Sequence, residues 1–255
     1  MATTTGRREG TGGASTEREV APGVYRFGAD RVNWYVVADE AGERLTVVDA
    51  GLPTNWEMLV EGLADLGYGL DDVAALVCTH GHPDHIGFAE RLRSTGVTVY
   101  GHEADGDLFD SDGGSVPRDL LHNLWRPSVL TYFVGVFRAG GASIDPLMAF
   151  EPMADGQVLD VPGEPEIRHV PGHSPGQCAL VLSDRGVVLA GDAIVTMDLR
   201  YRDRTGPQIP FVAVDHDRAR ESVSRLEDLG EVTLLTGHGE PWTGQAADAV
   251  RLALG

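Results

Sequence analysis

Residues 80–85 form the run that most constrains the fold of this chain. The run reads His-Gly-His-Pro-Asp-His, so four side chains that can bind divalent cations lie within six positions. The apolar segment 73–78 before it is typical of a buried strand. If the extended backbone continues past this strand, His80 and His82 point to the same side, because side chains alternate along a strand. Pro83 ends the extension, so the run supplies a second pair of ligands where the next helix begins and predicts half of a site for two metal ions.

Three polar residues further along the chain fit the other half of such a site. His173, Asp192 and His238 each lie beside a glycine and just after an apolar run. Each is therefore expected in a loop at the end of a strand, where a rigid scaffold positions binding residues. The neighbouring glycines allow tight turns and a close approach of the backbone.

In this order, the motifs resemble those of the metallo-β-lactamase-fold hydrolases and, within them, the glyoxalase II-like branch. The resemblance spans roughly residues 23–242 and begins with Asp49 in the segment Val-Val-Asp-Ala-Gly. It implies an α/β (α+β) fold, a four-layer αββα sandwich of two mixed β-sheets flanked by helices. The metal ions would lie at one edge, between the sheets.

The resemblance also implies a role for each motif residue. Two divalent metal ions are expected per chain; zinc is the first choice, and manganese or iron would also suit such ligands. Asp49 would orient the ligands through hydrogen bonds. The candidate catalytic residues are Asp84, His85 and Asp192. The implied ligands are His80, His82 and His173 for the first ion, Asp84, His85 and His238 for the second, and Asp192 as the bridge between them.

The activity that the resemblance implies is hydrolysis at a binuclear metal site. A hydroxide that bridges the two ions would attack a carbonyl carbon, while one ion polarises the carbonyl oxygen. No serine or cysteine nucleophile is needed, so Ser174 is expected to be a turn residue. The apolar content of residues 103–150 and 209–211 suggests a partly hydrophobic pocket. We therefore expect an ester, thioester or lactone of a small, partly apolar substrate.

Three comparisons within the superfamily bear on the substrate. Glyoxalase II proteins carry a further helical domain that binds glutathione, and the short sequence after His238 argues against glutathione thioesters. Asp192 argues against the β-lactamases proper, which generally lack the bridging aspartate. Quorum-quenching lactonases share the ligand set but carry a tyrosine three residues after that aspartate, where this chain has Val195. A lactonase-type enzyme is kept as an alternative.

Two further alternatives belong to other classes of protein. Persulfide dioxygenases resemble the chain through the same run of histidines but use a single iron with fewer ligands. A non-catalytic member would use its metals only to stabilise the fold, but structural zinc sites are usually closed and four-coordinate.

The segment 196–214 after the bridging aspartate is long for a loop in a compact domain, which is often a functional feature. Tyr201, Arg202 and Gln208 in it are candidate substrate contacts.

Composition narrows the partners and the compartment. The chain has 39 acidic and 20 basic residues, a formal net charge of −19, and each basic residue is an arginine. Such a surface repels nucleic acid and anionic lipid, so a small-molecule substrate is expected and no nucleic-acid or membrane partner is. Cys78 and Cys178 do not form a disulfide framework. Buried free thiols fit a cytoplasmic protein.

The sequence divides into a tail, a domain and an insertion. Residues 1–20 are rich in Thr, Gly, Ser and Arg and are typical of a disordered tail, not of a secretory signal. Residues 21–255 are expected to form a single domain with alternating strand and helix patterns. Within it, residues 103–150 predict a helical or looped insertion. Helices are also predicted over residues 55–66 and 219–229.

Overall fold

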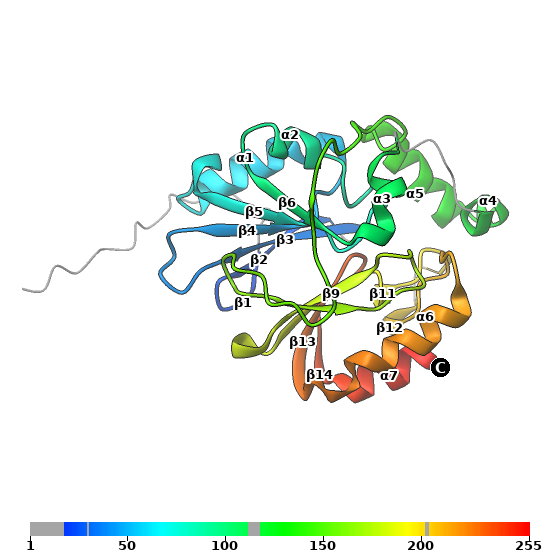
Figure 1. The fold of residues 1–255 in the computed structure, drawn as a ribbon. Coiled ribbons are helices and arrows are strands. Elements are labelled where there is room, and N and C mark those ends of the chain that lie inside the picture. The colour runs from blue at the N-terminus through cyan, green and yellow to red at the C-terminus, as the bar shows by residue number, and fades with distance from the viewer. Residues whose placement is uncertain (1–17, 30, 112–117, 202–203) are drawn as a thin grey trace, which may run out of the picture.

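The computed structural model describes residues 18–29, 31–111, 118–201 and 204–255 (Figure 1). Arg202, one of the predicted substrate contacts, lies outside these ranges, as does most of the predicted tail. The last residues of that tail, from Arg18 onward, belong to the first strand. No helix in the described ranges is long and apolar enough to cross a membrane.

The first half of the chain forms a seven-stranded mixed sheet whose strands follow sequence order. The strands before β5 pair antiparallel, and β4 to β7 pair parallel. Helices α1 (Trp56–Asp65) and α2 (Ala89–Arg93) cover the outer face of this sheet (Figure 1). The strands are β1 (Arg18–Ala21), β2 (Val24–Ala29), β3 (Val32–Ala38), β4 (Leu45–Val48), β5 (Val73–Val77), β6 (Thr98–Gly101) and β7 (Glu151–Pro152).

The second half forms a five-stranded mixed sheet in the order β14-β13-β10-β9-β8. Helix α6 (His216–Ser222), the 3₁₀ segment η5 (Val223–Leu229) and helix α7 (Ala246–Leu254) cover its outer face. The strands are β8 (Glu166–His169), β9 (Cys178–Leu182), β10 (Val187–Gly191), β13 (Glu231–Thr236) and β14 (Trp242–Gln245).

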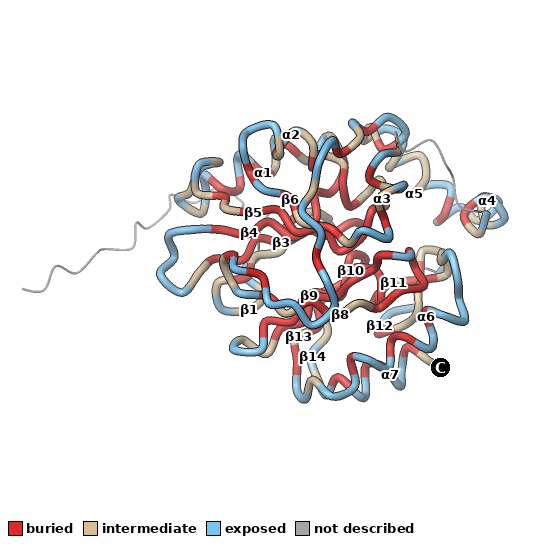
Figure 2. Tube along the Cα trace, in the orientation of Figure 1, coloured by how far each residue is buried: buried red, intermediate tan, exposed pale blue. Residues whose placement is uncertain are grey.

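Side-chain alternation explains why the two sheets stack as inner layers. On β3, Trp34 and Val36 join the apolar cluster under α1, whereas Tyr35 and Val37 join the cluster between the sheets. Both faces of the strand are therefore buried, as its mostly apolar sequence predicts (Figure 2). A third cluster lies between the second sheet and its helices. The predicted αββα sandwich of two mixed sheets is thus confirmed.

The segment predicted as an insertion is built from helices and loops. It contains a 3₁₀ turn η3 (Glu103–Asp105) and helices α3 (Gly106–Phe109), α4 (Arg118–Asn123) and α5 (Pro127–Arg138). Its two longer helices, α4 and α5, lie at one end of the sandwich, on the side of the first sheet (Figure 1). Their apolar side chains pack against Val32 and Leu52 of the sandwich.

Local structure differs from the sequence pattern in three places. The segment 196–214 is not simply a loop, because β11 (Val195–Met197) and β12 (Thr205–Gln208) pair in it. The helix predicted over residues 219–229 begins earlier, and its second half has 3₁₀ geometry. The second pair of predicted ligands lies in a turn four residues before α2, not at the first turn of that helix.

Two glycine substitutions test the packing of the helices. A Cβ atom on Gly62 of α1 would lie 2.2 Å from Cε1 of Phe27, so Gly62→Ala should lower the free energy of unfolding by about 1–3 kcal/mol. Gly135 on α5 has no atom within 4 Å of such a Cβ, so Gly135→Ala should raise it by about 0.5–1 kcal/mol. Urea unfolding midpoints of both variants measure these changes; a stable Gly62→Ala would contradict the close contact of α1 with the sheet.

Candidate metal centre

The predicted ligands come from loops at one edge of the two sheets. The 80–85 run follows β5, Asp192 follows β10 and His238 follows β13. Strands β4 and β5 are parallel, as are β10 and β13, so their carboxyl ends lie at a common edge. This is where open α/β sheets place their binding residues.

Hydrogen bonds between the sheets fix this edge. The Asn33 amide nitrogen on β3 donates to the carbonyls of Thr236 and Gly239 at 2.9 and 2.7 Å. The Tyr35 hydroxyl donates to the Thr236 carbonyl at 2.7 Å. Both polar side chains are buried, so these bonds satisfy two donors, the Asn33 amide nitrogen and the Tyr35 hydroxyl, that would otherwise be costly to bury. The loop that carries His238 is thereby held against the first sheet.

Three histidine nitrogens converge in a first group. Nε2 of His173 lies 3.2 Å from Nε2 of His80 and 2.8 Å from Nδ1 of His82. His80 and His173 are buried, and His82 is partly exposed. The three atoms belong to one set with metal-ligand spacing, as the sequence predicts for the first ion.

A second group lies beside the first, and Asp192 touches both. Oδ2 of Asp84 lies 3.5 Å from Nε2 of His238 and 3.9 Å from Nε2 of His85. Oδ2 of Asp192 lies 3.2 Å from Nε2 of His238 and 3.3 Å from Nε2 of His173. One carboxylate oxygen is therefore within reach of ligand atoms from both groups. The structure brings all seven residues of the predicted ligand set together.

Buried atoms without partners show that this cluster fits a cation. Nε2 of His85 and Oδ1 of Asp192 are buried, 3.7 Å apart, and have no hydrogen-bond partner among the described residues. Leaving such groups unpaired costs about 1–3 kcal/mol each. A Cβ atom on Gly237 would lie 2.1 Å from Oδ1 of Asp192, so only glycine leaves this space open. A cation between the two atoms would satisfy both.

In three of the histidines, the ring nitrogen that points away from the cluster contacts another group of the protein. Nδ1 of His173 donates to the Val212 carbonyl at 2.8 Å, and Nδ1 of His238 faces the Arg31 carbonyl. Nδ1 of His85 donates to Oδ2 of Asp49 at 2.9 Å. In the neutral imidazole, a proton on Nδ1 leaves the lone pair of Nε2 directed into the cluster. The surrounding residues thus select the tautomer that a metal ion requires.

Asp49 contacts His85 directly and His80 through Thr79. Its carboxylate accepts the backbone N–H of Thr79 at 2.7 Å, the Thr79 hydroxyl at 2.9 Å and the bond from His85. Oγ1 of Thr79 in turn lies 3.0 Å from Nδ1 of His80. Asp49 adopts a φ of 63°, which is uncommon for a residue other than glycine but tolerated by aspartate. This backbone conformation directs the carboxylate towards the cluster.

Asp105 joins the two loops that form the first group, and sequence analysis missed it. It is buried, and its Oδ2 accepts the backbone N–H of Gly81 at 2.9 Å and the Ser174 hydroxyl at 2.7 Å. Its Oδ1 accepts the backbone N–H of Gly176 at 2.6 Å. Its position just after the strand β6 was a signal that could have found it. Tyr132, which contacts Asp84, was also missed, and no sequence pattern marks it.

Charges within the cluster shift the pKa values of its members in opposite directions. Burial lowers the pKa of His80 and His82, and it lowers that of His173 to about 3. Burial also opposes the charged form of His85, but nearby carboxylates, first that of Asp192, raise its pKa to about 10. The pKa of His238 is raised for the same reason. At the second group, the carboxylates therefore outweigh the effect of burial and favour a positive charge.

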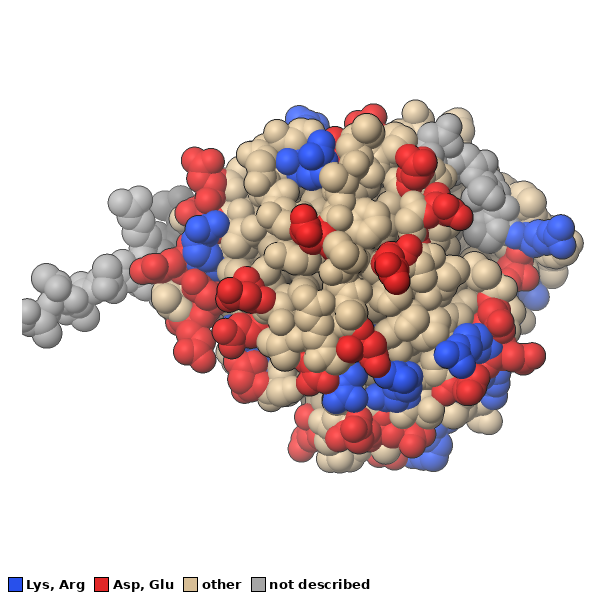
Figure 3. All heavy atoms as spheres, viewed as in Figure 1, with Lys and Arg blue, Asp and Glu red and all other residues tan. Residues whose placement is uncertain are grey.

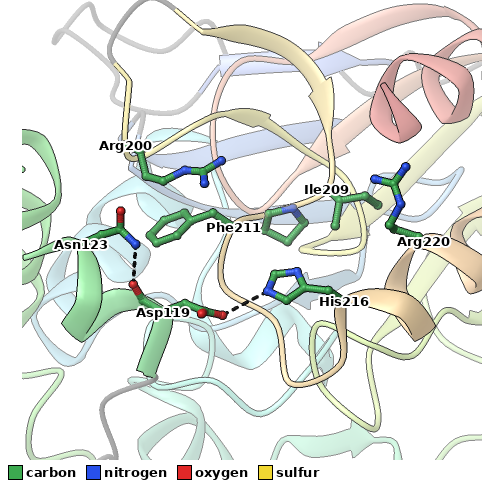
Figure 4. Close-up of a pocket in the computed structure, with 8 residues that line it drawn as sticks. Asp119, Asn123, Arg200, Ile209, Phe211, His216 and Arg220 are labelled. Atoms are coloured by element: carbon green, nitrogen blue, oxygen red, sulfur yellow. Dashed lines mark hydrogen bonds and ion pairs between the residues drawn. The ribbon is translucent and has the colours of Figure 1, made fainter.

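A pocket lies beside the centre, between α4 and the segment that leads into α6 (Figure 4). Its volume is about 330 Å³, within the range of small-molecule sites. Phe211 lines it, and the next residue is Val212, whose carbonyl holds His173. Tyr201 and Gln208 are not among its lining residues, although their neighbours are. The lining residues are Asp119, Asn123, Arg200, Ile209, Pro210, Phe211, His216 and Arg220.

Comparison with known proteins identifies the family. The chain matches the metallo-beta-lactamase superfamily over residues 27–238 and belongs to that superfamily. The probable metallo-hydrolase YflN of Bacillus subtilis (strain 168) is 28% identical over 247 residues, which cover 89% of this chain and 88% of the relative. Metallo-beta-lactamase domain-containing protein 1 of Xenopus laevis is 24% identical over 201 residues, 79% of this chain and 69% of the relative.

Solved structures share the fold. The metallo-beta-lactamase family protein TTHA1429 from Thermus thermophilus superposes with a TM-score of 0.68 and is 25% identical, covering 92% of this chain and 79% of its own. BJP-1, a subclass B3 metallo-beta-lactamase of Bradyrhizobium japonicum, has a TM-score of 0.60 at 21% identity, covering 88% and 77%. The family and the His/Asp cluster together indicate a metal-binding, hydrolase-like protein.

Replacing Asp105 tests whether one carboxylate holds the first group. In Asp105→Asn, the amide NH₂ cannot accept the N–H groups that the carboxylate accepts, so the free energy of unfolding should fall by about 1–3 kcal/mol. Metal affinity should fall about 10–100-fold, the usual loss when a group that orients a ligand is removed. The exposed Asp107 on α3 provides the control Asp107→Asn, which should change neither. Urea unfolding and chelator competition measure the two effects. If Asp105→Asn matched the wild type in stability and metal affinity, Asp105 would not hold the two loops of the first group together.

Metal binding should release protons at neutral pH. Because the pKa of His85 is raised to about 10, its imidazole holds an extra proton at pH 7 when no metal ion is bound, and the carboxylates that raise the pKa of His238 favour its charged form as well. A metal ion must displace the proton on His85, so its apparent affinity should increase as the pH rises from 7 towards 10. Calorimetric titration with zinc in buffers of different ionisation enthalpy should detect at least about one proton released at pH 7. Binding without proton release would contradict these charge states.

Proposed function

We propose that the chain is a binuclear, metal-dependent hydrolase that cleaves an ester, thioester or lactone bond in a small, partly apolar substrate. The observation that carries this proposal is the position of Oδ2 of Asp192, within 3.3 Å of ligand nitrogens from both groups. A carboxylate so placed suits a bridge between two ions, and a binuclear site with a bridging position suits hydrolysis. The same ligand set underlies the resemblance to the glyoxalase II-like branch.

The clustered residues would bind the two ions, and their neighbours would orient them. His80, His82 and His173 would hold one ion, and Asp84, His85 and His238 the other, with zinc expected and manganese or iron as alternatives. When bound, such ions lower the pKa of a water molecule and polarise a carbonyl oxygen. Asp192 would fix the spacing of the two groups. Asp49 would keep His85 and, through Thr79, His80 in the tautomer that binds metal.

The pocket beside the centre would hold the part of the substrate that does not react. Ile209, Pro210 and Phe211 give it an apolar wall, and the guanidinium groups of Arg200 and Arg220 add hydrogen-bond donors. The last residue of this wall, Phe211, directly precedes Val212, whose carbonyl holds His173. Binding energy from a remote part of the substrate could therefore position the scissile carbonyl at the centre.

We infer that the substrate is a small molecule and not a nucleic acid or a membrane. The formal net charge of −19 opposes binding to either polyanion. On the face that Figure 3 shows, the described residues carry acidic side chains throughout, with arginines in separate groups. A nucleic-acid site would require a basic stripe or patch.

Metal analysis with a substrate panel tests the proposal. As-purified protein should contain about two equivalents of zinc, manganese or iron per chain and should hydrolyse members of a panel of aryl esters, thioesters and lactones. Asp192→Asn should lose metal and at least about 10²-fold in kcat/KM, since it removes the group shared by both ions. The exposed Asp107→Asn on α3 makes the same change away from the cluster and is the matched control.

Two outcomes would contradict the binuclear hydrolase. The first is two bound ions without hydrolysis of any panel member. The second is a single iron with oxygen uptake on a persulfide, which would favour the mononuclear dioxygenase class.

A further inference from the structure

Helix α5 of the insertion reaches the metal centre through one side chain, Tyr132. Helix α5 packs its apolar face onto the sandwich, and Tyr132 is only 8% exposed. Its ring lies edge-on to that of His238, with centroids 5.9 Å apart. The phenol is therefore held at the second group of ligands by packing that does not depend on its hydroxyl.

The hydroxyl of Tyr132 contacts the ligand atom itself. It donates to Oδ2 of Asp84 at 2.5 Å, a short, charge-assisted hydrogen bond. The same oxygen faces Nε2 of His238 and Nε2 of His85, at 3.5 and 3.9 Å. It is thus the oxygen that would bind the second ion. A carboxylate oxygen has lone pairs for both a hydrogen bond and a metal, so the two contacts are compatible.

Asp84 is held differently from the other members of the cluster. Residues of the sandwich or its edge loops fix His85, His173 and His238. Among the described residues, the carboxylate of Asp84 accepts a hydrogen bond from Tyr132 alone. Its orientation therefore depends on α5, an element of the insertion.

We propose that Tyr132 is a positioning residue that orients Asp84 and so sets the affinity of the second metal position. The inference rests on the proposed function, because it assigns Asp84 to the second of two ions. It gives the insertion a role at the centre in addition to its contribution to the pocket wall. Groups that orient metal ligands in this way typically change metal affinity 10–100-fold when removed.

The test uses Tyr132→Phe, which deletes the hydroxyl and keeps the packed ring. The control is Thr131→Val, which removes a hydroxyl from the exposed face of the same helix, where it donates to the Pro127 carbonyl. Zinc-loaded proteins are titrated with a chromophoric chelator, and cobalt-substituted proteins are examined by their d–d absorption. We expect Tyr132→Phe to bind one of its two ions about 10–100-fold more weakly with an altered cobalt spectrum, and Thr131→Val to match the wild type.

A double variant separates positioning from general support of the fold. In an Asp84→Asn background, Tyr132→Phe should cause no further loss of metal, because the ligand that it orients is already changed. An equal loss in both backgrounds would overturn the proposal, as would two equally tight ions in Tyr132→Phe. If the wild type binds only a single ion, the proposed binuclear function is wrong. The role of Tyr132 would then fail too, because it requires a second ion at Asp84. The metal count of the wild type thus distinguishes the two failures.

Discussion

The interaction on which the rest of the structure depends is the burial of carboxylates among imidazoles at the edge of the sheets. Asp192 is 3% exposed, and Nε2 of His85 beside it has no hydrogen-bond partner among the described residues. An isolated charge in such a place is costly, and breaking up a buried cluster of charges usually costs several kcal/mol. The arrangement becomes favourable when a cation binds, so folding and metal binding are coupled at this edge.

Such a cluster can persist only if its members cannot rotate away from one another. The scaffold achieves this by contacting the outer side of several of them: the Val212 carbonyl holds His173, and Asp49 holds His85. Asp105 binds the two ligand loops to each other through three hydrogen bonds. Asn33 connects the sheets beneath them. These bonds hold the clustered side chains in place. The rigid, well-packed sandwich stabilises the fold enough to offset the unfavourable free energy of placing like groups close together.

The clustering of these residues could be predicted from sequence because each lies in a local pattern of strand, glycine and polar residue, and strand exits share an edge. The layered fold came from the resemblance of these motifs, since periodicity alone does not fix which sheet a strand joins. Asp105 and Tyr132 were missed because their partners are far away in sequence, at Gly176 and Asp84, and only the tertiary structure brings them together. The pairing of β11 with β12 was missed for a different reason, because β12 consists of glycine, proline and polar residues, which are not typical of strands.

The insertion explains how a shared scaffold can carry an individual activity. Residues of the sandwich or its edge loops hold His85, His173 and His238, whereas Asp84 takes its hydrogen bond from α5. The same insertion supplies Asp119 and Asn123 to the pocket, and Asp119 also pairs with His216 on the opposite side, 3.1 Å away. The pocket and the second group therefore share one element, the insertion. A change in that element would alter both the shape of the pocket and the orientation of Asp84, so substrate preference and metal affinity are expected to vary together among relatives with different insertions.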